Sequence, residues 1–275
     1  MGFYKKQFIT YFSILLAIGL AWNVGLAFYP NEHFKNLYLL MYIVFFLSDA
    51  AIILAYSIKV GLYTILGKGL LCLGIGLILR SASFGTILLF PIFLGHPVPL
   101  VSINDILLVS MYGTLFLCMR YLLNIFQTFI KTRFIIEASG IFIVTTILYA
   151  YPLFSQQTIF TITSSWFIKL LTFFYAIADT LLLALAYLLV RVSGGRLHKS
   201  LVFFVAAMIS MIFGLAIINY AAPSSDYLTS IMNPNDVPFT LGVFFASLGM
   251  VYVVESMLKF GEKEQLAPWK NLYIK

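Results

Sequence analysis

The chain has 275 residues, of which 62% are hydrophobic and 10% are charged, with a formal net charge of +7 at pH 7 and a mean hydropathy of +1.01. A soluble domain is about half apolar and about a quarter charged, so this composition excludes a water-soluble fold and predicts a chain that lies mostly in lipid. The positive charge does not indicate a nucleic-acid partner, because the basic residues stand between apolar runs and not along one face of a soluble domain. The lipid bilayer is therefore the predicted partner, and the cell membrane is the predicted location.

The apolar runs predict an all-α integral membrane fold with about eight transmembrane helices. Each run has roughly the twenty residues that a helix needs to cross about 30 Å of hydrocarbon. The first run follows Lys5 and Lys6 without a cleavage pattern, so it is predicted to be a span and not a removed signal peptide. The runs lie near residues 8–28, 37–58, 69–94, 105–130, 134–154, 166–190, 200–221 and 237–260.

Lysine and arginine residues gather in alternate connectors, and this asymmetry predicts the orientation. The connectors between them carry almost no basic residues. By the positive-inside rule, the N- and C-termini are both predicted to be cytoplasmic. The basic side carries Lys5, Lys6, Lys59, Lys68, Lys131, Arg133, Arg191, Arg196, Lys199 and the lysines of the tail.

Landmarks of the first half recur in the second half in the same order. They predict a tandem 4+4 repeat, with one four-helix unit at residues 1–130, a second at 131–261 and a short cytoplasmic tail at 262–275. Because each unit has an even number of spans, the two units are predicted to share one orientation. The matched landmarks are Tyr29-Pro30 with Tyr151-Pro152, Asp49 with Asp179, and Asn104-Asp105 with Asn235-Asp236, at spacings of 122, 130 and 131.

Three ionisable residues, Asp49, Arg80 and Asp179, are predicted near the membrane midplane. A charge there costs several kcal/mol unless it is paired or hydrated, so these residues are the predicted ligand-binding site. Asp49 and Arg80 lie in neighbouring spans and are expected to meet as an ion pair. Met211 stands at the position that matches Arg80, so Asp179 lacks an equivalent partner. One hypothesis is that Arg80 faces both aspartates, or one aspartate and an anionic ligand group. The other is that these residues only hold helices together.

A second candidate site is formed by Asn104, Asp105, Asn235 and Asp236, at the outer starts of the fourth and eighth spans. Side chains of this kind cap helix N-termini, and their charge suits the positive end of the helix. The alternative is that they gather a cation or a polar ligand at an outer mouth. Any crevice is expected to open outward between the halves, lined by the second, third, sixth and seventh spans.

No cofactor, metal site or catalytic residue is predicted. The histidines His33, His96 and His198 all lie outside the spans, so no axial pair is available for a haem. Cys72 and Cys118 lie inside apolar runs and are expected to be free thiols. No HExxH motif, GxSxG elbow or phosphate-binding glycine loop is present.

A spaced set of aromatic, acidic and leucine residues marks the second half. The pattern is Tyr175-x-x-x-Asp179-x-x-Leu182-Leu183, then a basic connector, then Asp236 before an apolar span that contains Gly242. This pattern resembles the polytopic membrane sensory regions at the N-termini of bacterial histidine kinases and diguanylate cyclases. No kinase or cyclase domain follows here, so the resemblance implies a sensor or adaptor that signals through a membrane or cytoplasmic protein partner.

Three functions stay open at this point. The first is a non-enzymatic sensor, adaptor or subunit of a membrane complex, with a ligand site between the repeats. The second is a small solute or proton-coupled transporter, although matched Pro or Gly breaks in the spans are not clear. The third is an intramembrane lipid-modifying enzyme. The span that holds Asp49 also resembles the eight-span lysoplasmalogenases, which are lipid hydrolases, but their histidine-bearing motifs are not found.

Overall fold

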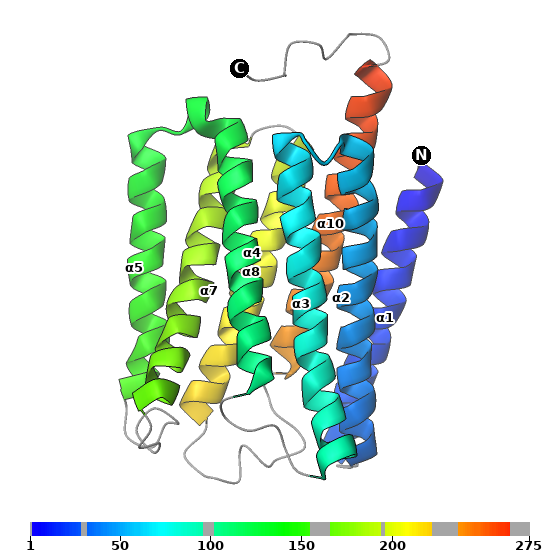
Figure 1. Ribbon diagram of the computed structural model, residues 1–275, viewed down its shortest axis with the longest axis vertical. Helices are drawn as coiled ribbons and strands as arrows, with labels where there is room; N and C mark the ends of the chain where they lie inside the picture. The colour runs from blue at the N-terminus through cyan, green and yellow to red at the C-terminus, as the bar shows by residue number, and fades with distance from the viewer. Residues whose placement is uncertain are drawn as a thin grey trace.

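The computed structural model describes residues 2–28, 32–95, 102–154, 166–193, 196–221 and 236–264. These residues form an all-helical bundle without a β-strand, and the long helices run side by side along one axis (Figure 1). A short 3₁₀ helix, η1 (Gln127–Phe129), follows the fourth α-helix. The α-helices in the described ranges are α1 (Gly2–Phe28), α2 (Glu32–Val60), α3 (Ile65–Leu94), α4 (Ile103–Phe126), α5 (Thr132–Phe154), α7 (Trp166–Val192), α8 (Arg196–Ala221) and α10 (Asp236–Glu264).

Five helices have described segments that are long and apolar enough to cross a membrane: α2, α3, α4, α5 and α7. The described apolar segments of α1, α8 and α10 are shorter, at Gln7–Trp22, His198–Gly214 and Thr240–Val253. Ile106, Ile136 and Ile147 leave 67%, 67% and 61% of their surface exposed, which suits lipid better than water. The all-helical prediction is confirmed, and the apolar helices are compatible with a membrane protein.

Six helices form a ring in which each packs on the next, in the order α2, α3, α4, α7, α8 and α10, and α10 closes the ring on α2. Helix α1 packs on α2 and α10, and α5 packs on α7 and α8. Figure 1 shows α1 and α5 at opposite edges of the bundle. The α2–α10 and α4–α7 contacts each join the first half of the chain to the second.

Basic side chains gather at one end of the bundle. The turns after α2, α4 and α7 lie at the end where α1 begins and α10 ends (Figure 1). Lys59, Lys131 and Arg191 lie at or beside these turns, and all three are exposed. The basic residues that are predicted to be cytoplasmic thus lie at one end of the bundle. Which end faces the cytoplasm stays a prediction.

Helix α3 approaches both of its neighbours closely because small residues line two of its sides. A Cβ atom added at Gly74 would lie 2.6 Å from Cδ2 of Leu54 in α2, and one added at Gly76 would lie 2.9 Å from Oγ1 of Thr114 in α4. Small residues let helix backbones approach in lipid, where burial of apolar surface does not drive association. This packing therefore fixes the rotation of α3 about its own axis, with Gly74 against α2 and Gly76 against α4.

We expect Gly67→Ala to destabilise the protein. A Cβ at Gly67 would collide with the carbonyl oxygen of Gly61, which lies in the turn between α2 and α3 at a φ of +99°. Overpacking of this kind costs about 1–3 kcal/mol. Thermal unfolding of the purified protein measures the loss. The matched control is Gly85→Ala in the same helix, where a Cβ meets nothing within 4 Å, so its melting temperature should be unchanged or higher. Equal melting temperatures for the two variants would contradict the close approach at Gly67.

Candidate functional site

Two hydrogen bonds between tyrosine and aspartate side chains join α4 to α7. The hydroxyl of Tyr112 donates to Oδ1 of Asp179 at 2.7 Å, and the hydroxyl of Tyr175 donates to Oδ1 of Asp105 at 2.9 Å. The two helices run in the same direction (Figure 1). Asp105 and Tyr112 are about two turns apart on α4, and Tyr175 and Asp179 are about one turn apart on α7, so each pair shares one helix face. Each helix supplies one donor and one acceptor.

The inner of these two hydrogen bonds lies in the core. Asp179 and Tyr112 are both buried, and each exposes 7% of its surface. The ring of Tyr112 lies 5.9 Å from the ring of Tyr175, at an angle of 30°. A hydrogen bond to a charged group contributes about 1.5–3 kcal/mol, which is more than the contact of two aromatic rings contributes. The hydrogen bond to Asp179 is therefore the stronger of these two interactions of Tyr112.

Arg80 of α3 is the cation of this region. Its guanidinium carbon lies 4.7 Å from the centre of the Phe84 ring. Its positive charge acts electrostatically on Asp179, Tyr112 and Tyr175. Within the described part of the chain, Arg80 makes neither a direct ion pair nor a hydrogen bond with a side chain. We call Arg80, Asp105, Tyr112, Tyr175 and Asp179 the Arg80 cluster.

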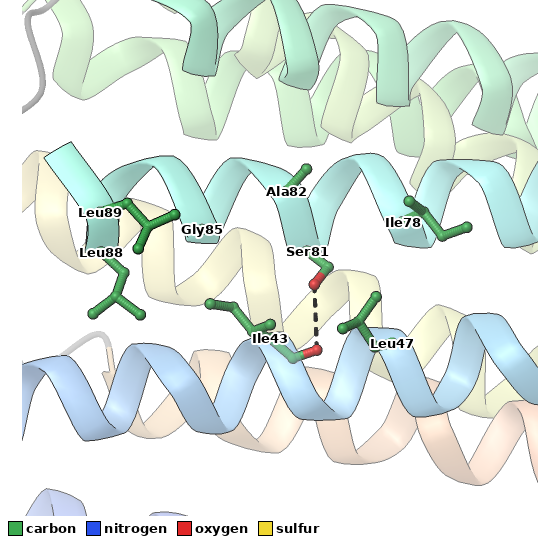
Figure 2. Close-up of a pocket in the computed structure, with 8 residues that line it drawn as sticks. All are labelled: Ile43, Leu47, Ile78, Ser81, Ala82, Gly85, Leu88 and Leu89. Carbon is green, nitrogen blue, oxygen red and sulfur yellow. Dashed lines mark hydrogen bonds between the residues drawn. The ribbon is translucent and has the colours of Figure 1, made fainter. Parts of the chain in front are cut away.

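The direction of Arg80 follows from the packing of α3. Ser81 donates to the carbonyl oxygen of Ile43 at 3.3 Å, so this side of α3 faces α2 (Figure 2). Ser83 donates to Oδ1 of Asn104 at 2.5 Å, so that side faces α4. Residues three or four positions apart share a helix face. Arg80 shares a face with Ser83 and also with Phe84, whose ring stacks on Tyr42 of α2, so it points into the bundle between α4 and α2.

Asp49 lies apart from the Arg80 cluster, at the contact between α2 and α10. It is fully buried, and its Oδ2 lies 2.7 Å from Oγ of Ser247. Its Oδ1 has no hydrogen-bond partner among the described residues. The predicted ion pair between Asp49 and Arg80 is not formed: Asp49 contacts Ser247 of α10, and the guanidinium of Arg80 stacks on Phe84.

The predicted outer mouth is described on the α4 side only. Ser102 is the N-cap of α4, and Oδ2 of Asp105 accepts a hydrogen bond from its backbone N–H at 2.9 Å, which completes a capping box. Asn104 does not cap the helix with its side chain. It joins α4 to α3 instead, through Ser83 and Thr86. Of the matching residues in the second half, Asn235 lies outside the described residues, and Asp236 begins α10 with a side chain that is not described.

An apolar groove of about 350 Å³ lies between α2 and α3 (Figure 2). Its one polar side chain, Ser81, is bonded to the backbone of α2. The groove belongs to the first half alone, and the expected crevice would be lined by both halves. It has no group that could recognise a charged ligand. The lining residues are Ile43, Leu47, Ile78, Ser81, Ala82, Gly85, Leu88 and Leu89.

The hydrogen-bond partners of the two aspartates, Tyr112 and Ser247, were not predicted from the sequence. Tyr112 could have been found, because a phenol in the middle of a span needs a polar partner and Tyr112 stands two turns after Asp105. Ser247 gives no such signal, because its spacing from Asp49 says nothing about which helices meet. No group of three or more His, Cys, Asp or Glu side chains in the described ranges could hold a metal ion.

We expect Tyr112→Phe to lower the stability of the protein by about 1–3 kcal/mol, because it leaves a buried carboxylate without its donor. Thermal unfolding of the purified variant gives the change. Tyr63→Phe is the matched control, because Tyr63 is 95% exposed in the turn between α2 and α3. A Tyr112→Phe protein as stable as Tyr63→Phe would mean that Asp179 does not depend on the phenol.

Comparison of the chain with protein-family models, with curated proteins and with solved structures finds no match. The resemblance to bacterial sensory membrane regions therefore stays a prediction from the sequence. The described residues form an all-helical chain whose apolar helices are compatible with a membrane protein.

Proposed function

We propose that the chain is a multi-pass protein of the cell membrane that binds a small ligand with an anionic group at the Arg80 cluster. It acts as a non-enzymatic sensor, adaptor or subunit of a membrane complex. The observation that carries the proposal is Arg80, a cation inside a candidate span with no acceptor bonded to it in the described part of the chain.

The energies favour a ligand over a purely structural role for Arg80. An arginine at the centre of a span costs about 2.5–3.5 kcal/mol on insertion scales. The stacking of its guanidinium on Phe84 returns about 0.5–2 kcal/mol. Asp179 acts on Arg80 from a distance, and one of its oxygens is already bonded to Tyr112. An anionic group held by the five guanidinium N–H donors supplies the missing stabilisation.

The proposed duplication relates the Arg80 cluster to a second contact between the two halves of the chain. In the proposed 4+4 repeat, α2 corresponds to α7, and α4 corresponds to α10. Of the contacts between the halves, that of α2 with α10 and that of α7 with α4 then correspond to each other, and α1 also packs on α10. Each contact contains an aspartate of a second helix that is hydrogen-bonded to a hydroxyl group of a fourth helix: Asp49 to Ser247, and Asp179 to Tyr112. This correspondence supports a parallel repeat with a pseudo-twofold relation.

We expect anionic ligands to stabilise the wild-type protein and to leave Arg80→Gln unchanged. The experiment is a thermal-shift screen of the purified protein against small carboxylates, organophosphates and sulfonates. A ligand at 100 times its Kd contributes about 2.7 kcal/mol of stability. The control is Arg120→Gln, which removes an exposed arginine from α4 and should respond as the wild type does. A ligand that stabilises wild type and Arg80→Gln equally binds elsewhere and contradicts this site.

Transport is the second candidate, because the Arg80 cluster lies between helices of both halves, where an alternating-access mechanism would place a substrate. Flux into proteoliposomes separates the two functions. Any ligand that passes the thermal-shift screen is offered to vesicles that contain wild type, Arg80→Gln or Arg120→Gln. Binding without uptake supports the sensor or adaptor, whereas uptake that is lost only in Arg80→Gln supports the transporter.

The proposed orientation places the basic end of the bundle in the cytoplasm. In a Cys72→Ala/Cys118→Ala background, we expect Ile103→Cys to react with a membrane-impermeant maleimide on intact cells. Tyr63→Cys should react only after lysis. Ile103 begins α4 at one end of the bundle, Tyr63 lies at the other end, and both are exposed (Figure 1). The reverse labelling pattern would invert the topology.

A further inference from the structure

We propose that Asp49 is a proton-binding site. Its side chain is a neutral carboxylic acid whose hydroxyl donates to Oγ of Ser247 and so joins α2 to α10. This site is separate from the Arg80 cluster and goes beyond the proposed ligand function.

The number of hydrogens at Ser247 supports the neutral form. Oγ of Ser247 lies 2.7 Å from Oδ2 of Asp49 and 3.1 Å from the carbonyl oxygen of Val243, one turn earlier in α10. A hydroxyl has one hydrogen and can satisfy one of these two oxygens, but it can also accept. If Ser247 donates to Val243, the short contact with Asp49 needs a hydrogen on the carboxyl group. A neutral Asp49 satisfies both contacts.

An ionised Asp49 would be poorly solvated. Its side chain is fully buried, Oδ1 has no partner in the described ranges, and Ser247 would supply one donor for the whole charge. Phe45 and Ile53, one turn before and one turn after Asp49, are fully buried in an apolar cluster that also contains Val243 and Met250 of α10. An unpaired charge in such surroundings costs far more than a neutral acid with one hydrogen bond.

None of the helices that pack on α2 supplies a counter-charge among the described residues. On α1, the hydroxyl of Tyr11 is bonded to Ser48. On α3, Arg80 stacks on Phe84 and forms neither an ion pair nor a hydrogen bond with Asp49. On α10, Ser247 is the polar group that contacts the carboxyl.

The two matched aspartates therefore differ in what surrounds them. Asp179 accepts a hydrogen bond from a phenol at 2.7 Å and belongs to the Arg80 cluster. Asp49 contacts a serine that can accept, and it forms no ion pair among the described residues. Asp179→Asn is for this reason the matched control for Asp49→Asn.

Infrared spectroscopy tests the proposal directly. The full chain is measured at neutral pH in a maltoside detergent, which has no carbonyl group, in H₂O and in D₂O. We expect a C=O stretching band of a protonated carboxyl group that moves to lower wavenumber in D₂O. The band should be absent from Asp49→Asn and present in Asp179→Asn.

Ser247→Ala keeps the carboxyl group and covers the case in which Asp49→Asn does not fold. It should move the band to higher wavenumber, because the acid loses its acceptor. A wild-type spectrum without a carboxylic acid band overturns the proposal. So does a band that disappears in Asp179→Asn, or one that is the same in wild type, Asp49→Asn and Ser247→Ala. Loss of ligand response in Arg80→Gln would leave this proposal untouched, because Arg80 forms neither an ion pair nor a hydrogen bond with Asp49.

Discussion

The structure depends on the need of polar side chains in an apolar medium to find partners on other helices. Lipid offers no hydrogen bonds, so a buried hydroxyl or carboxyl group is stable only where a second helix brings a matching group. Tyr112 with Asp179, Tyr175 with Asp105, and Asp49 with Ser247 each meet this requirement across a helix contact. Van der Waals packing brings the helices together, and these bonds select their register.

The same requirement explains the role of α3. Its small residues allow close approach to α2 on one side and to α4 on the other, and this leaves one direction for the long side chain of Arg80. Arg80 points into the bundle between these two neighbours, where its guanidinium stacks on Phe84 and its charge acts on groups of α4 and α7. The charge distribution of the interior is thus a consequence of where glycine and serine occur on a neighbouring helix.

The sequence was sufficient for the helices and insufficient for their contacts. Apolar runs of span length and the basic residues between them are local properties, so the helical class and the approximate helix positions could be predicted. The pairing of Asp49 with Ser247 depends on the meeting of α2 with α10, which the sequence does not encode in any spacing. An ion pair between Arg80 and Asp49 was predicted because their spans are neighbours in the sequence. The two helices do pack on each other, but Asp49 lies on the side of α2 that meets α10.

The partners of the two matched aspartates have a consequence for the history of the chain. Asp49 in the first half is satisfied by α10, and Asp179 in the second half is satisfied by α4. Under the proposed duplication, a four-helix ancestor on its own would have presented its aspartate to lipid. In that proposal, such an ancestor would be stable as a homodimer that makes this contact twice, and fusion of the two genes would leave each copy free to diverge. Divergence of this kind would explain why Arg80 in the first half is matched by Met211 in the second half.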